Sequence, residues 1–285
     1  MFIIIGAIVV LISLVVGFTM AGGHLLVLIQ ISEFITIGGA ALGSFLIMAD
    51  LRTIKKVIAA IPKALTAKSS TKDDNLSILK SLYDLFLLAQ RDGLLAIEKH
   101  IETPEESEIL SANSKFIKNK TAVAFLCDTL KVMLSGGVPP HEIEGLMDTE
   151  IETFEAENAP VSALLTKLSD AFPGLGIVAA VLGIIVTMGS INEGAEKVGH
   201  HVAAALVGTF LGILLSYGFV GPLATNIEYL IESEVRYLEM IKACVIAYAK
   251  GNPPIVAVEI GRRTITSDAR PSFSELENYL RGRSE

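Results

Sequence analysis

Residues 171–191 read AFPGLGIVAAVLGIIVTMGSI, and residues 202–225 read VAAALVGTFLGILLSYGFVGPLAT. Neither stretch contains Asp, Glu, Lys, Arg or His. A helix needs about 20 mostly apolar residues to cross the hydrocarbon core of a bilayer. These two stretches therefore predict a pair of transmembrane helices, joined by a short connector at residues 192–201.

Two further apolar stretches lie near the N-terminus, at residues 2–20 and 34–49. The second can extend backwards past Glu33 to about residue 30. A cleaved signal peptide is the alternative for residues 2–20, but no Lys or Arg precedes this stretch and its apolar region is too long. We therefore expect an all-α membrane protein with four transmembrane helices in two hairpins, within residues 1–49 and 169–225.

The composition agrees with this class. The chain has 285 residues, of which 51% are hydrophobic and only 19% charged, whereas soluble domains have about 25% charged residues. Of its 23 Lys and Arg residues, Lys197 alone lies outside residues 50–168 and 226–285. Because Lys and Arg concentrate on the cytoplasmic side, we expect these two segments and both termini to be cytoplasmic.

The segment 50–168 is predicted to be helical. Apolar residues repeat at helical spacing from Leu76 to Ile101, behind the N-cap candidates Asp73 and Asp74, and we expect this helix to end at Pro104. A second amphipathic helix is expected from about Asn119 to Leu134. A third, acidic helix is expected to begin at Pro139-Pro140. The segment 226–285 is expected to form a further helical region and a tail.

The predicted spans lack ionisable groups, and a proton or cation path through a bilayer needs one. If the protein conducts an ion, the titratable group must come from another chain; the alternative is that the spans are only anchors. Small residues favour a tightly packed bundle, because lipid-embedded helices associate over them. They lie at Gly39-xxx-Gly43, at Gly208-xxx-Gly212, and at Gly176, Ala179, Ala180 and Gly183.

Two prolines flank the second predicted hairpin. Proline lacks a backbone N–H and kinks a helix or begins one. Pro173 suits a helix start, whereas Pro222 lies between glycines and predicts a bend. The few polar residues of the spans, Ser44, Thr187, Thr209, Ser216 and Tyr217, are expected to bond to their own helix. Thr209 stands out because it follows Gly208.

The whole layout resembles the MotA family of flagellar motor stator proteins. The resemblance rests on the two stretches quoted first, on MAGGHL after the first span, on AQRDGLLAIEKHIETPEESEIL at residues 89–110, on GLMDTEIETFE, and on PPIVAVEIGRRT with RPSFSELE in the tail. It covers nearly the whole chain. ExbB and TolQ proteins share the last two spans, but they have three spans and a different cytoplasmic layout.

The resemblance implies a subunit of the bacterial inner membrane with no catalytic residue, metal or cofactor. Five such subunits would surround a dimer of MotB-type chains. Each MotB-type chain has one transmembrane helix with an Asp that carries the ion. Ion flow would turn the ring, and the cytoplasmic helices would push the rotor protein FliG. The alternative is an ExbB/TolQ-like subunit that drives an outer-membrane process.

The resemblance also implies roles for particular residues. Pro173 and Pro222 match the family's two functional prolines, and Thr209 and Tyr217 are assigned to the same ion path. Ala180 stands where sodium-driven relatives place Thr, whose hydroxyl suits a hard cation, so a proton is predicted. Rotor contact is assigned to Glu98, to Glu102 and to Arg91, which lies one place after the usual position, occupied here by Gln90. A spacing of seven would put Arg91 and Glu98 on one helix face.

Other functional classes are disfavoured. The net charge of −8 gives no basic footprint for nucleic acid. Cys127 and Cys244 form neither a CxxC motif nor a disulfide framework. Five scattered histidines, including the pair His200-His201, come without an HExxH motif or a Ser-His-Asp set. A membrane enzyme would need a polar constellation inside the spans, and the sequence has none.

Overall fold

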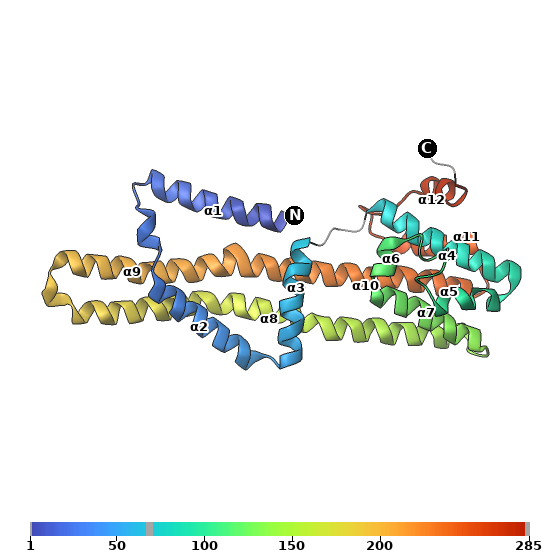
Figure 1. Ribbon diagram of the computed structural model, residues 1–285, viewed down its shortest axis with the longest axis horizontal. Coiled ribbons are helices and arrows are strands. Elements are labelled where there is room, and N and C mark those ends of the chain that lie inside the picture. Colours follow the sequence, from blue (N-terminus) through green and yellow to red (C-terminus); the bar gives the residue numbers. More distant parts are fainter. Residues whose placement is uncertain (1, 67–70, 283–285) are drawn as a thin grey trace. The chain divides into compact units, whose positions relative to one another are not determined.

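The computed structural model describes residues 2–66 and 71–282, which form helices with no strand among them (Figure 1). The predicted all-α class is confirmed. The chain divides into two compact units. We call Met1–Lys68 with Asn158–Ile231 the apolar unit, and Ser69–Glu157 with Glu232–Glu285 the polar unit.

The apolar unit contains the membrane-spanning candidates. Within the described residues, four stretches are long and apolar enough to cross a membrane: Phe2–Met20, Leu25–Met48, a part of Pro140–Gly189 and a part of Ala195–Ala249. The unit's elements are α1 (Phe2–Met20), η1 (Leu25–Leu28), α2 (Ile31–Met48), α3 (Leu51–Thr66), the second part of α8 (Pro140–Gly189), η3 (Ile191–Glu193), α9 (Ala195–Ile213), η4 (Leu214–Val220) and the start of α10 (Gly221–Ala249). The four expected spans fall within these stretches.

The predicted boundary between the acidic helix and the third span is not a helix boundary. A single 50-residue helix, α8, contains both, and it continues through Pro160 and Pro173. The expected limit at residues 168/169 therefore falls inside a helix. Pro173 is an interior residue of α8 and does not begin it. Continuous packing along α8 outweighs the single backbone hydrogen bond that each proline removes.

The helical run that contains the fourth predicted span is longer than that span. Helix α9 begins at Ala195, seven residues before the predicted start at residue 202, and passes directly into η4 and α10. The expected end at residue 225 falls inside α10. The apolar composition marks only the part of this helical run that lacks charge, whereas the helix continues as an amphipathic one.

Helices α8 and α9 touch through their backbones, side by side in Figure 1. A Cβ atom on Gly176 would lie 2.8 Å from the carbonyl oxygen of Gly208, and one on Gly212 would lie 2.5 Å from that of Phe172. A Cβ on Gly183 would lie 2.8 Å from the Cβ of Ala205. We call this contact the glycine seam. Two of the predicted small-residue stripes therefore pack against each other, as expected for lipid-embedded helices.

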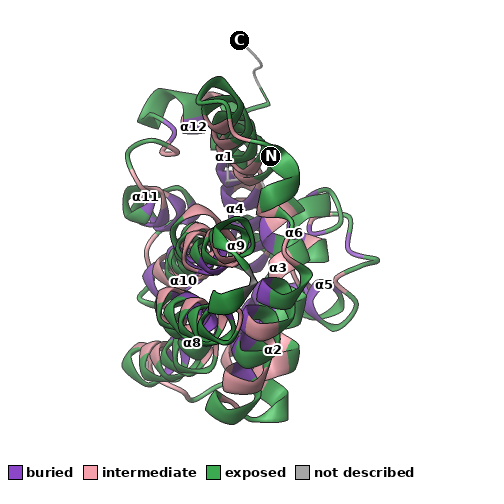
Figure 2. Ribbon diagram, turned by 90° about the vertical axis from the view of Figure 1, so that its left-hand side faces the viewer, coloured by how far each residue is buried: buried purple, intermediate pink, exposed green. Residues whose placement is uncertain are grey.

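The remaining helices of the apolar unit bury narrower faces (Figure 2). None of the 19 residues of α1, all described, is buried. Gly39 and Gly43 of α2 have open space around them, so the third predicted stripe has no partner within the described chain. Helix α3 is amphipathic and buries Val57 and Ala64 in a small cluster with Phe45.

The polar unit has its own core. It contains α4 (Lys72–Asp92), η2 (Leu94–Ile97), α5 (Glu98–Glu102), α6 (Ser114–Lys118), α7 (Lys120–Ser135), the first part of α8, the rest of α10, α11 (Pro254–Thr264) and α12 (Phe273–Leu280). Helix α4 packs against α11 and η2, and α5 packs against α7. The rings of Phe86 and Tyr248 stack with centroids 4.5 Å apart.

Two details of α4 differ from the prediction. Its N-cap is Thr71, with Asp74 at the third helical position closing a capping box, so neither expected Asp is the N-cap. The helix ends at Asp92 and not at Pro104, because Gly93 has a φ of +90°, which only glycine adopts without strain. The predicted helix from Asn119 is confirmed as α7.

The glycine seam gives a direct test. Gly176→Ala should weaken the packing of α8 on α9 by about 1–3 kcal/mol, because the added methyl group meets backbone atoms that cannot rotate away. Thermal unfolding of the detergent-purified protein measures this change. Gly174→Ala is the matched control, since the same helix leaves open space around Gly174. Equal melting temperatures for the two variants would contradict the seam.

Candidate functional site

A pair of serines joins the regions of the two predicted functional prolines. Ser169 of α8 donates a hydrogen bond of 3.1 Å to the carbonyl oxygen of Ser216, and the two hydroxyl oxygens lie 3.2 Å apart. Both residues are buried. Ser169 lies four residues before Pro173, so its own carbonyl is the one that loses an α-helical partner to that proline. The serine pair therefore joins α8 to η4 at the turn where Pro173 removes one backbone hydrogen bond of α8.

The second proline follows a widened helical turn. Element η4 is a π-helix, in which the N–H of Gly221 bonds to the carbonyl of Ser216. Pro222 is then the second residue of α10, where its missing N–H would otherwise pair with Gly218. Single π turns and prolines are common causes of helix bends and often occur at functional sites. The predicted bend region at Pro222 therefore has a structural basis.

The other predicted path residues lie in different environments. Ala180 and Thr209 are both half-buried, and Thr209 lies at the glycine seam. The Cα of Thr209 would lie 3.3 Å from a Cβ on Gly176. Tyr217, by contrast, is 72% exposed on η4, so it does not join the seam and faces the surroundings of the chain.

A carboxylic acid lies in the second span, outside its predicted core of residues 34–49. Glu33, which only the backward extension of that span includes, lies in the first turn of α2 and is only 6% exposed. Its Oε2 atom is buried and has no hydrogen-bond partner among the described residues. The signal was present in the sequence, since an 18-residue helix ending at Met48 has to include position 33.

The predicted rotor contacts are all on the surface of the polar unit. Arg91 lies in the last turn of α4 and donates to Asp92 at 2.7 Å, with 72% of its side chain exposed. This guanidinium lowers the pKa of Asp92. Glu98 and Glu102 are exposed at the two ends of α5, one turn apart. The prediction that Arg91 and Glu98 share one helix face is wrong, because Gly93 breaks the helix between them.

A buried histidine anchors α5. His100 is 6% exposed, and its Nδ1 lies 2.8 Å from the hydroxyl oxygen of Ser107. The same hydroxyl accepts the backbone N–H of Leu110 at 3.1 Å. Burial lowers the pKa of His100, and the nearby charge of Lys99 lowers it further. Glu98 and Glu102 therefore project from a short helix that a neutral imidazole holds in place.

A shallow groove of about 280 Å³ lies beside this helix, between α5 and α7. Glu102 and Glu105 line it together with Lys120 and Lys131. Lys131 is paired with Asp128 at 2.9 Å. That hydrogen bond raises the pKa of Lys131, and Glu102 contributes a smaller attraction. The groove thus presents both signs of charge to a protein partner.

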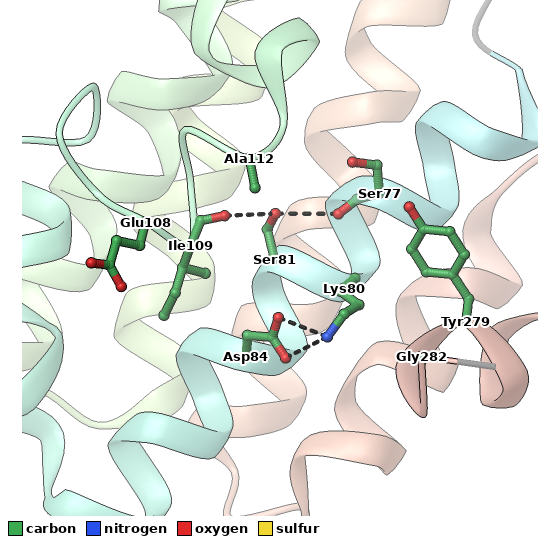
Figure 3. Close-up of a pocket in the computed structure, with 9 residues that line it drawn as sticks. All are labelled: Ser77, Lys80, Ser81, Asp84, Glu108, Ile109, Ala112, Tyr279 and Gly282. Carbon is green, nitrogen blue, oxygen red and sulfur yellow. Dashed lines mark hydrogen bonds and ion pairs between the residues drawn. The ribbon is translucent and has the colours of Figure 1, made fainter. Parts of the chain in front are cut away.

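A larger cavity of about 480 Å³ lies elsewhere in the polar unit (Figure 3). Lys80 and Asp84 pair across one turn of α4 at 2.9 Å, and Ser81 donates to the carbonyls of Ser77 and Ile109. Tyr279 lies at its edge. Because its cation, Lys80, is already paired with Asp84, this cavity offers little to hold an anionic small molecule.

Metal binding and nucleophilic chemistry have no site among residues 2–66 and 71–282. These residues contain no group of three or more His, Cys, Asp or Glu side chains that could hold a metal ion. Burial raises the pKa of Cys127 to about 11, so this residue stays a thiol at neutral pH. The features that remain are a bend-prone helix pair, a buried carboxyl group and a charged outer surface.

Comparisons with known proteins agree with these features. Residues 4–93 match the family described as "Motility protein A N-terminal", and residues 113–240 match the "MotA/TolQ/ExbB proton channel family". "Motility protein A" of Salmonella typhimurium is 38% identical over 281 residues, which cover 99% of this chain and 95% of that protein. "Chemotaxis protein LafT" of Vibrio parahaemolyticus is 33% identical over 275 residues, 96% of each chain.

Two solved structures share the fold. "Structure of C. jejuni MotAB" superposes with a TM-score of 0.79 at 20% identity, covering 95% of this chain and 98% of that one. "Structure of the flagellar MotAB stator complex from Bacillus subtilis" gives a TM-score of 0.71 at 23% identity, covering 90% and 92%. At these identities the likeness concerns the fold.

The histidine anchor predicts an acid-sensitive segment. His100 binds a proton less readily when folded, so protonation of the unfolded segment lowers its stability as the pH falls below the ordinary histidine pKa of about 6.5. Hydrogen exchange of residues 98–110, corrected for intrinsic rates, should be faster at pH ~5.5 than at pH ~7.5. His100→Gln, which cannot titrate, should remove this difference. An unchanged difference in that variant would assign it to another group.

Proposed function

Because this chain belongs to the motility protein A family, it is a non-enzymatic, ion-driven stator subunit of the flagellar motor, and we propose that its spans form the wall of a proton conduit that a second chain completes. One observation carries this proposal. After Gly208, the sequence of α9, η4 and α10 contains no Asp, Glu, Lys, Arg or His until Glu228. A proton crossing this apolar stretch needs a titratable group from elsewhere.

The partner that would supply this group is a MotB-type chain with one transmembrane helix and an Asp. The titles of both similar structures name MotAB, which supports such a partner. Exposed apolar side chains also support it, since they need lipid or protein around them: α8 alone exposes Ile177, Val178, Val181, Leu182, Ile184 and Ile185. A ring of five copies around the partner's helices would cover part of this surface.

The transported ion is proposed to be a proton. Ala180 presents no oxygen atom at the position where a hydroxyl would help to coordinate a dehydrated sodium ion. Thr209, the nearest hydroxyl on the facing helix, lies beside the seam. A proton needs no coordination shell of this kind, because it moves between titratable groups and water.

Torque would be transmitted along two continuous helices. Helices α8 and α10 each run without a break from the apolar unit into the polar unit. A change of bend at Pro173 or Pro222, coupled through Ser169 and Ser216, would therefore displace residues far along the same helices. This gives the two prolines a mechanical role and requires no covalent chemistry.

The proposed contact surface for the rotor protein FliG consists of Arg91, Glu98 and Glu102 with the adjacent groove. All three side chains are exposed, and the pair Arg91–Asp92 is worth little to folding because solvent screens it. Exposed charges of this kind set partner recognition and association rates rather than stability. The polar unit and both termini would lie in the cytoplasm, beneath the inner membrane.

An ExbB/TolQ-like energiser is the second candidate, since the match at residues 113–240 includes that group. The separate match of residues 4–93 to the motility protein A N-terminal family disfavours it. So does the identity of 38% to a motility protein along 99% of the chain.

Charge reversal tests the rotor contact. Glu98→Lys should lower swimming speed by about half or more, because it places like charge against the partner's surface. Tethered-cell rotation and the membrane level of the complex are the measurements. Glu142→Lys, another exposed carboxylate of the polar unit, is the matched control and should swim normally. Loss of the assembled complex in Glu98→Lys would show that the residue is structural.

A further inference from the structure

Glu33 is the buried charge-bearing group that the mechanism above does not use. It is the one Asp, Glu, Lys, Arg or His within the bounds of α1 and α2. Only 6% of its surface is exposed, and its Oε2 atom has no hydrogen-bond partner among the described residues. An ionised carboxylate in this position has nothing to offset its lost hydration.

The carboxyl group lies where three helices meet. A Cβ on Gly208 of α9 would contact Oε2 of Glu33 and lie 3.3 Å from its Cδ. The same Cβ would lie 3.2 Å from the Cβ of Ala179 in α8. The other side of Gly208 is the glycine seam, where its carbonyl oxygen faces Gly176. Gly208 therefore leaves the space that Glu33 fills, next to the residues assigned to the ion path.

A second unpaired group lies on the same face of α9. The Nδ1 atom of His201 is buried without a partner among the described residues. His201 precedes Gly208 by seven residues, two helical turns, so the two positions share a face. The other charged groups near this end of the spans, His24, Glu196, Lys197 and His200, are exposed. Helix α8 contributes no ionisable side chain between residues 171 and 191.

We propose that Glu33 is a proton-binding group of this channel. A proton entering from outside would reach Glu33 before it reaches the acid that the partner supplies. The inference rests on the proposed function. Glu33 lies at the end of α2 opposite to Arg52, Lys55 and Lys56, hence on the side from which protons arrive. His201 lies farther toward the connector between α8 and α9, two helical turns from Gly208.

The step is a proton transfer and involves no other bond. The Glu33 carboxylate accepts a proton from outside water and becomes a neutral acid, the form that tolerates burial against Gly208. It then gives the proton to water or to the partner's carboxylate and returns to the anion. Each cycle moves one proton inward and leaves this chain unchanged.

A structural role is the competing explanation. Glu33 is the third residue of α2, and carboxylates near a helix N-terminus are stabilised by the helix dipole. However, the side chain of the N-cap residue Gln30 makes no capping hydrogen bond, so Gln30 and Glu33 do not form a capping box. A purely structural carboxyl group would affect the amount of assembled complex and not the proton flux through each complex.

The test uses the full chain assembled with its partner in proteoliposomes and in swimming cells. Glu33→Gln keeps the size and polarity of the side chain and removes proton binding. It should lower proton flux per complex by at least about tenfold, and it should flatten the dependence of speed on external pH. Glu33→Asp should restore part of the flux. Ser32→Ala, an exposed neighbour on the same helix, is the matched control.

The outcomes are distinct. A Glu33→Gln complex with normal flux and a normal pH profile would overturn the inference, and so would a variant that loses only assembled complex. If the unaltered complex itself carries no protons, the proposed function fails whatever Glu33 does. If the unaltered complex conducts and the Gln variant conducts equally well, the inference alone fails.

Discussion

The close backbone approach of α8 and α9 is the constraint on which the rest of the apolar unit depends. Lipid removes the hydrophobic driving force between helices, so their association relies on contact area and small residues. Gly176, Gly208 and Gly212 bring the two backbones together. This approach brings Thr209 to the seam and leaves the space at Gly208 that Glu33 occupies. A side chain at any of the three glycines would separate the helices.

The seam also explains why the bend-prone elements lie elsewhere. Where glycines hold α8 and α9 in register, neither helix can change its curvature freely. The Ser169–Ser216 pair, the π-helix and Pro222 lie beyond the seam, and Pro173 lies at its edge, next to Phe172. In the proposed mechanism, bending would occur in these segments, whose backbone hydrogen bonds are already missing or widened.

Much of the fold could be predicted from the sequence, because span prediction depends on composition and that signal is strong. The positions at which helices end or continue could not be predicted in the same way. Leu94, Ile97 and Ile101 continue the apolar spacing of α4, and only the positive φ of Gly93 reveals the end of that helix. Conversely, Pro173 suggested a helix start, but α8 continues through it as one helix.

The candidate site was predicted in part. Pro222, Thr209 and Ala180 were found from their residue types, and Gly208 from its spacing. Ser169 was missed because its partner Ser216 lies 47 residues away, a separation that no local pattern reports. Glu33 was missed because the core of the second span was chosen as a stretch without charged residues, and Glu33 is the one charged residue of α2. The family relation adds the stator function, which the residues alone would not specify.

The central claim is that this chain forms a conduit wall and that a second chain lends the acid in its middle. Proton flux into liposomes tests it most directly, with the purified chain alone compared with the chain purified together with its partner. The account predicts rapid flux for the complex and none above background for the chain alone. Equal flux in both preparations would contradict it, because Glu33 would then be sufficient without a partner's carboxylate.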